Sequence, residues 1–244
     1  MHQHQLLNNI THQNIKVNPK LSVELGNNVA STLIFPTEFN SIQKEFAILL
    51  RKHPETEKFY ALSLFGFENE ENLFLSNKTN SGWQANYVPA MLAKGPFLIG
   101  FQDQSKADGN EKEAVIHIDM NNARVGETEG MPLFLEHGGN SSYLEYIANT
   151  LHCINDGQHL SEIMFTAFTE LGLIEALNIE FELYNGDKYD LQGYYTINEE
   201  KLATLDGANL EKLNRAGFLQ SAFQIISSLS NLQTLINMKN QTVI

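Results

Sequence analysis

Several features that would assign a chain to a broad class are missing from these 244 residues. There is one cysteine, Cys153, so no disulfide can form within the chain. No uninterrupted run of about 18 apolar residues occurs, and we therefore expect no membrane-spanning helix. The net charge of −13 provides no cationic surface for phosphate groups, so we expect no binding of nucleic acid and no docking on anionic lipid.

The N-terminal segment lacks the features of a secretory signal. Residues 1–13 are rich in His, Gln and Asn, with no basic start and no apolar run. A cytoplasmic location is expected on this ground, and export to the cell surface by a signal-independent route is the alternative. The polar, turn-rich residues 1–28 are interpreted as a flexible or surface-lying lead, followed by a single domain over residues 29–244.

What the chain does contain is enough apolar material for a globular core. Hydrophobic residues make up 42% of the sequence and charged residues 18%, and there are fifteen phenylalanines. Runs of aromatic and aliphatic residues predict strands, and a short helix is predicted over residues 86–94. The predicted strands cover residues 46–51, 59–67, 71–76, 97–101 and 114–120. The polar residues 103–112 are predicted to form an exposed connection.

Two helices are predicted in the middle of the chain. Ser142 and Glu145 have the spacing of a capping box, ahead of apolar residues at helical spacing. Residues 155–157, with the sequence Asn-Asp-Gly, predict a break. A second helix, with an apolar face that includes Met164 and Phe168, would then complete a helical hairpin.

A β-hairpin over residues 177–197 can be predicted together with its register. A three-residue loop, Tyr184 to Gly186, sets Phe181 opposite Tyr189 and Glu182 opposite Lys188. Gly186 then lies where the loop needs a left-handed residue. A two-residue loop would place apolar residues opposite charged ones, so we favour the longer loop.

The C-terminal segment is predicted to be helical. Asp206 is placed to cap a short helix that ends before Gly217. Apolar residues then follow a spacing of four and three, as in a coiled-coil seam. The residues of this seam are Phe218, Ala222, Ile225, Leu229, Leu232 and Ile236. The seam packs either on its own domain or on a second copy, through Phe218, Ile225, Leu229 and Leu232.

Together these elements predict an α+β fold. We expect a mostly antiparallel sheet, built from the first half of the chain and the hairpin at 177–197. Several helices would cover this sheet, and the chain would end in a helical segment.

His117 and Asp119 are the sharpest candidates for metal chemistry. Residues two apart on a strand point to the same face, and a His-x-Asp pair with a later histidine can bind non-haem iron. Later histidines are present at 137, 152 and 159. The alternative is an ordinary hydrogen-bonded pair on a strand, which we favour. We predict no metal and no cofactor, because no phosphate-binding, nucleophile-elbow or zinc motif occurs.

Other polar residues have simpler interpretations. The histidines at 2, 4 and 12 would chelate a metal only weakly. Cys153 is next to His152, but a lone cysteine on an apolar helix face is more often buried filler than a nucleophile. The acidic residues 68, 70 and 71 lack the pattern of a calcium loop.

The segment from Trp83 to Phe97 is the most distinctive in the chain. It contains the only tryptophan and two of the six prolines. Its candidate binding residues are Trp83, Tyr87, Pro89, Lys94 and Phe97. The aromatic members would form either a platform for a peptide or a sugar, or part of the core.

Four blocks, in order along the chain, resemble the SapC family of bacterial proteins. They are residues 35–49, with Phe-Pro-Thr-Glu-Phe and then Phe-Ala-Ile-Leu; residues 64–74, with Leu-Phe-Gly-Phe and then Glu-Asn-Leu-Phe; residues 83–97; and residues 193–219. Residues 129–134 resemble a further family segment. The family has a basic pair before a Tyr-Pro-Phe motif, whereas this chain has Lys94-Gly95-Pro96-Phe97.

The resemblance implies a function only in outline. The family takes its name from a surface-layer-associated protein, and some members are encoded beside tryptophan halogenases, cupin-like hydroxylases and outer-membrane receptors. No set of catalytic residues can be carried over. We therefore expect a non-enzymatic binding or accessory protein, linked to the surface layer or to outer-membrane uptake and modification, with a protein or peptide partner. An oxygenase using His117 and Asp119, and a homodimeric structural protein, are the alternatives.

Overall fold

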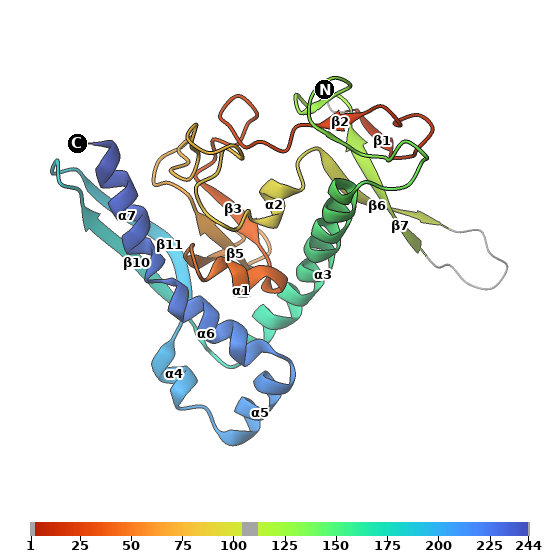
Figure 1. Ribbon diagram of the computed structural model, residues 1–244. Helices are drawn as coiled ribbons and strands as arrows, with labels where there is room; N and C mark the ends of the chain where they lie inside the picture. Colours follow the sequence, from red (N-terminus) through yellow and green to blue (C-terminus); the bar gives the residue numbers. More distant parts are fainter. Residues whose placement is uncertain (1–2, 104–111, 244) are drawn as a thin grey trace.

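A computed structural model describes residues 3–103 and 112–243. It confirms the α+β class, since antiparallel sheets are combined with helices (Figure 1). The strands are β1 (His4–Leu6), β2 (Lys16–Val17), β3 (Ser31–Ile34), β4 (Ile48–Lys52), β5 (Phe59–Leu64), β6 (Phe97–Asp103), β7 (Lys112–Asp119), β8 (Val125–Gly126), β9 (Met131–Pro132), β10 (Ile174–Glu182) and β11 (Lys188–Ile197). The helices are η1 (Pro36–Glu38), α1 (Phe39–Ile42), α2 (Ala90–Ala93), α3 (Ser142–Glu170), α4 (Glu199–Ala203), α5 (Gly207–Arg215), α6 (Phe218–Ser228) and α7 (Asn231–Thr242).

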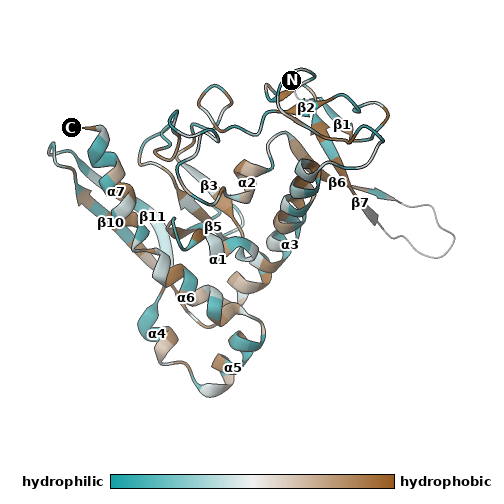
Figure 2. Ribbon diagram, viewed as in Figure 1, coloured by the Kyte–Doolittle hydropathy of each residue, from teal (hydrophilic) through white to brown (hydrophobic). Residues whose placement is uncertain are grey.

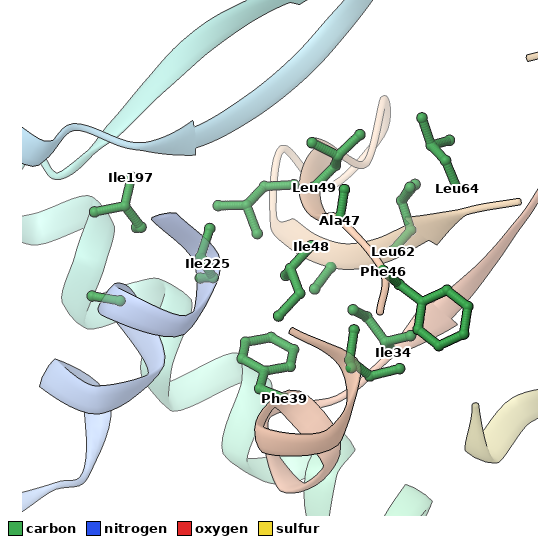
Figure 3. Packing of buried hydrophobic residues seen from close by; sticks show 14 of the residues in the cluster. Ile34, Phe39, Phe46, Ala47, Ile48, Leu49, Leu62, Leu64, Ile197 and Ile225 are labelled. Atoms are coloured by element: carbon green, nitrogen blue, oxygen red, sulfur yellow. The ribbon is translucent and has the colours of Figure 1, made fainter. Parts of the chain in front are cut away.

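The largest sheet has five strands in the order β10-β11-β4-β5-β3, all paired antiparallel. Its apolar residues, with those of α1, α3 and α6, form the main core. Figure 3 shows Ile48 of the sheet between Ile34 of the same sheet and Ile225 of α6, with Phe39 of α1 close to Ile48. The predicted hairpin at 177–197 therefore joins the sheet of the first half of the chain.

The hairpin has the predicted register. Phe181 lies opposite Tyr189, and Glu182 lies opposite Lys188. The backbone N–H of Gly186 donates to the carbonyl of Leu183 at 2.9 Å, and Gly186 has a φ of +91°. The three-residue loop is thus confirmed, and β10 begins three residues before the predicted strand.

A second core lies under two smaller sheets. Their strand orders are β1-β7-β6 and β8-β2-β9. Residues 97–119 were expected in the main sheet, but their inward side chains, Phe97 and Ile118, face the N-terminal half of α3 instead. Strands β1 and β2 come from residues 3–28, and Val17 and Leu21 in this segment are buried. The predicted connection at 103–112 lies, from 104 to 111, outside the described residues.

The predicted helical hairpin is wrong, because α3 is one continuous helix of 29 residues. Its N-cap is Ser141, whose side chain accepts a hydrogen bond from the backbone of Leu144, rather than Ser142. Gly157 does not break the helix. A Cβ atom at this position would lie 2.4 Å from Cβ of Phe35 and 2.5 Å from Oγ1 of Thr37, so glycine allows η1 to approach α3 closely.

The strand predicted at residues 71–76 is also wrong. This segment is irregular and shares only an isolated bridge, from Leu75 to Trp83. The buried side chain of Asn72 accepts a hydrogen bond from the backbone of Phe74 and donates one to the carbonyl of Asn27. A side chain that binds nearby backbone in this way competes with a strand ladder.

The C-terminal helices pack on their own domain. Asp206 caps α5, and Gly217 precedes α6 with a φ of +77°, both as predicted. Phe218, Ala222 and Ile225 of the predicted seam are buried in the main core, which leaves them inaccessible to a second copy. The seam is divided between α6 and α7 by a turn at residues 229–230. Of the helices in the described ranges, none is long and apolar enough to cross a membrane.

Candidate functional site

The aromatic rings proposed as a binding platform lie mainly in the interior. Trp83 is 2% exposed, its ring stacks on Phe74 at 5.4 Å, and its Nε1 donates to the carbonyl of Tyr87 at 2.8 Å. Phe97 is fully buried in the second core. The indole N–H therefore has a partner within the protein, and these two rings stabilise the fold.

Tyr87 and Ala90, the first residue of α2, share a hydrogen-bond partner, the buried carboxylate of Glu38. The hydroxyl of Tyr87 and the backbone N–H of Ala90 each donate to Oε2 of Glu38 at 2.9 Å. Pro89 is the buried N-cap of α2, which explains why this helix is shorter than predicted, since proline disfavours helical geometry in the residue before it. Burial raises the pKa of Glu38, and the hydrogen bonds from Ala90, Tyr87 and Phe35 oppose this effect.

Lys94, the last of the predicted binding residues, lies at the C-terminal end of α2. Its Nζ is 3.5 Å from the carbonyl of Phe97, which is a weak hydrogen bond. Among the residues that the structure describes, Lys94 forms no ion pair. Burial lowers its pKa below the ordinary lysine value. Its charge is thus partly removed from water without a counter-charge from the described residues.

Lys94 lines an open groove of about 740 Å³, which we call the α3 groove. Its walls come from β3, the start of β5, α2, β6 and the C-terminal part of α3. Figure 2 shows hydrophobic colouring on α2 and part of β3, two of these elements. The apolar wall residues are Leu33, Ile34, Phe35, Phe59, Ala61, Met91, Leu98, Ile99, Leu151, Ile154 and Phe165. Leu33 is 42% exposed and Leu98 is 36% exposed, so apolar surface is open to solvent here.

Charged residues around the α3 groove differ in their ion pairing. Lys94 lies on the side formed by α2 and β6. Near the start of β5, Lys58 is paired with Glu162, and Glu57 is paired with Lys52. Glu170 also lines the groove and forms no ion pair with the described residues. Of the two lysines that line the groove, Lys58 therefore has an ion-pair partner among the described residues and Lys94 does not.

Of the residues that line the α3 groove, only Lys94 is among the candidate binding residues named from the sequence. The walls of the groove come from five elements spread over residues 33–170, and no short motif links them. The available signal lay within α3, where Leu151, Ile154 and Phe165 lie at helical spacing. Leu151 and Phe165 are also buried in the cores. The predicted break at 155–157 hid the continuity of α3.

The structure places His117 and Asp119 on β7, with His4 of β1 opposite Asp119. Within residues 3–103 and 112–243, no group of three His, Cys, Asp or Glu side chains could hold an ion. Asp119 is 4% exposed, and its Oδ1 accepts from the backbone N–H of Gln3 at 2.8 Å. His117 lies against Gly100 on the neighbouring strand. Thus the side chains of this pair contact neighbouring strands and backbone.

The remaining candidates also have structural partners. Sγ of Cys153 lies 3.3 Å from Oγ1 of Thr37, and burial raises the pKa of the thiol, which disfavours the nucleophilic thiolate. His12 is buried, with its ring nitrogens near Asn8 and Gln5. His4 belongs to β1. His2 lies outside the described residues.

A second, smaller cavity of about 120 Å³ lies on the other side of α2 and is lined by Arg124. The guanidinium of Arg124 donates to the carbonyls of Asn18 and Lys20 and to the side chain of Asn27. Burial lowers the pKa of Arg124. Its hydrogen bonds attach the segment of residues 18–27 to the second core, so the protein itself supplies acceptors for this cation.

Comparison with known proteins identifies the family. The SapC family model matches residues 7–235. The chain belongs to the SapC family. No curated protein and no solved structure matches it significantly. The SapC match covers the α3 groove and both cores, so these features lie within the family domain.

Proposed function

We propose that this SapC-family protein is a non-enzymatic binding or accessory protein, and that its ligand is a small apolar molecule held in the α3 groove. The groove itself carries the proposal. Its volume of about 740 Å³ lies within the range of about 300–1,000 Å³ that is usual for small-molecule sites. Its lining is mainly apolar with a few polar groups, which is also usual for such sites.

The energetics favour an apolar occupant. Burial of apolar surface contributes roughly 25 cal/mol per Å². Leu33 and Leu98 are walls of the groove whose exposed surface a ligand would cover. The rigid setting of the walls supports this role, because β3 and β5 belong to the main sheet and α3 is anchored in both cores.

The cellular role that we propose follows the family. The family name supports an association with the surface layer or with outer-membrane uptake and modification. A cytoplasmic location, as expected from the N-terminal residues, would instead support an intracellular accessory role. Fractionation of the native organism, with detection of the full chain by antibody, distinguishes the two locations.

Binding of an uncharged, environment-sensitive dye such as Nile red tests the groove. We expect saturable binding to the purified full chain. Ile154→Gln, inside the groove, should weaken binding roughly tenfold, because a polar amide replaces an apolar contact. Ile163→Gln is the matched control, since Ile163 is on the same helix, is 61% exposed and does not line the groove.

Circular dichroism of both variants keeps the comparison interpretable. Two outcomes contradict the proposal: no saturable binding to the wild-type protein, or equal weakening by the two substitutions while both variants stay folded.

A further inference from the structure

We infer that the ligand of the α3 groove is a single-chain amphiphile with a carboxylate head group, and that the carboxylate pairs with Lys94. This inference rests on the proposed function and makes it more specific. It comes from three features of the groove: its shape, the state of its hydroxyl groups, and the position of its charges.

The shape favours an extended chain. The residues of α3 that line the groove run from Leu151 to Glu170, a length of about 28 Å at about 1.5 Å per residue. A groove that follows α3 over this length accommodates an extended chain lying along the helix.

Three hydroxyl groups of α3 that line the groove are satisfied by their own helix. Ser161, Thr166 and Thr169 each donate to a carbonyl of their own helix, at 2.8, 2.8 and 2.7 Å. A hydroxyl group has one hydrogen to donate, so a hydroxyl that donates to the helix backbone cannot donate to a ligand at the same time. These residues therefore add a wall that an alkyl chain can contact without leaving a donor unpaired.

Charge complementarity determines the head group and its direction. Lys94 has three donors, and its one hydrogen bond to the described residues is the weak one to Phe97. A carboxylate would provide a charged acceptor, which makes shorter and stronger bonds than a neutral one. Lys58, the other lysine that lines the groove, is already paired with Glu162, so a carboxylate is favoured at Lys94 and the chain extends from there toward β5.

The partial burial of Lys94 makes pairing with an anion more favourable. A partly desolvated ammonium without a counter-charge is unfavourable, and the lowered pKa of Lys94 has this cause. An anion at the same position offsets that cost. The carboxylate of the ligand would thus supply the counter-charge that Lys94 lacks among the described residues.

Displacement of Nile red from the full chain by matched amphiphiles tests the inference. The probes are dodecanoate, dodecan-1-ol and dodecyl phosphate, each below its micelle concentration. We expect wild-type protein to bind dodecanoate at least tenfold more tightly than dodecan-1-ol. Lys94→Met should abolish this preference while leaving the affinity for dodecan-1-ol within twofold.

Two further variants control for non-specific effects of charge. Lys58→Met removes a cation at the other side of the groove and should leave the preference for dodecanoate within twofold. Lys94→Arg should retain most of the preference. Equal affinities of wild-type protein for dodecanoate and dodecan-1-ol, or a preference that survives Lys94→Met, would overturn the inference.

The outcomes also separate this inference from the proposed function. Binding of the dye and of dodecan-1-ol without a preference for the acid leaves the proposed function standing and removes the role of Lys94. Failure of every probe, dye included, contradicts the proposed function itself. Tighter binding of dodecyl phosphate than of dodecanoate overturns the assignment of a carboxylate and identifies a phosphate head group.

Discussion

Two buried or half-buried lysines in this protein have opposite surroundings. Lys239, on α7, is 6% exposed, and its Nζ lies 2.9 Å from Oε1 of Glu68 and 2.5 Å from Oε1 of Glu71. It also lies over the ring of Tyr189, at 5.9 Å from the centroid. Lys94, on the wall of the α3 groove, has a single weak hydrogen bond and no ion pair with the described residues.

The pKa values of the two lysines shift in opposite directions for this reason. Burial alone lowers the pKa of Lys239, but its hydrogen bonds to Glu71 and Glu68 outweigh burial and raise the pKa above the ordinary value. For Lys94 only burial acts, and the pKa falls. A buried cation with internal counter-charges fixes two parts of the fold together, whereas one without them is free to pair with a ligand.

The largest expected effect is on stability, and it separates the two lysines directly. Lys239→Met should lower the free energy of unfolding by about 3 kcal/mol, because the half-buried carboxylate of Glu71 would lose its ion-pair partner. For a chain of this size the loss corresponds to a fall in Tm of roughly 6–12 °C. Lys94→Met should change the free energy of unfolding by less than about 1 kcal/mol, since no carboxylate loses a partner. Urea unfolding of both variants measures the difference.

The double variant Lys239→Met/Glu71→Gln provides the control for this prediction. It should recover part of the lost stability, because the unpaired negative charge is removed together with the lysine. An equal loss for the two single lysine variants would show that the contrast between the sites is wrong.

A smaller effect, on ligand affinity, is expected when a carboxylate is introduced beside Lys94, as Glu68 and Glu71 lie beside Lys239. Leu98 lines the groove on the same side as Lys94, and Leu98→Glu would place a carboxylate there. This internal acid should compete with the ligand and lower the affinity for dodecanoate about tenfold, which is about 1.4 kcal/mol. Leu98→Gln, of similar size without the charge, should lower the affinity for dodecanoate and dodecan-1-ol alike. Dye displacement measures both, and equal effects of Glu and Gln on dodecanoate would contradict the proposed pairing.

The smallest effect is on how stability depends on pH in the alkaline range. The pKa of Lys94 is lowered on folding, so the unfolded chain binds more protons just below the ordinary lysine pKa of 10.5, and stability from this group rises with pH there. The pKa of Lys239 is raised, so its contribution is complete below 10.5 and is lost as pH rises above that value. Unfolding curves at a series of pH values should show the rise disappear in Lys94→Met and persist in Lys239→Met. A rise that persists in Lys94→Met would assign it to another group.

The sequence predicted those elements whose structure depends on residues close to one another in the chain. The hairpin register follows from Gly186 and from the pairing of Glu182 with Lys188, and the caps at Asp206 and Gly217 follow from residue type. Strands β4, β5, β6 and β7 lie close to their predicted positions because their apolar runs are long. The ordered sequence blocks pointed to the SapC family, and the family model confirms this over residues 7–235.

Contacts between distant segments explain what the sequence did not predict. The sequence Asn-Asp-Gly that ends at Gly157 is typical of a helix break. In the structure Gly157 instead makes room for Phe35, which is more than a hundred residues away in the sequence. The segment at 71–76 has strand-like residues, but Asn72 and the ion pair of Glu71 hold it in turns. The α3 groove exists only once five separate elements are assembled, so only Lys94 among its residues could be singled out in advance.

Because α3 is continuous, it links the unfolding of the two cores. Leu144 and Ile147, near its start, are buried in the second core, and Met164 and Phe168, near its end, are buried in the main core. In Figure 1 the helix extends from the N-terminal strands to the C-terminal helices. Fraying from either end would withdraw apolar side chains from the core at that end and remove support from the rest of the helix. We therefore expect the two cores to unfold as one cooperative unit, with a single transition and similar protection of their amides from hydrogen exchange.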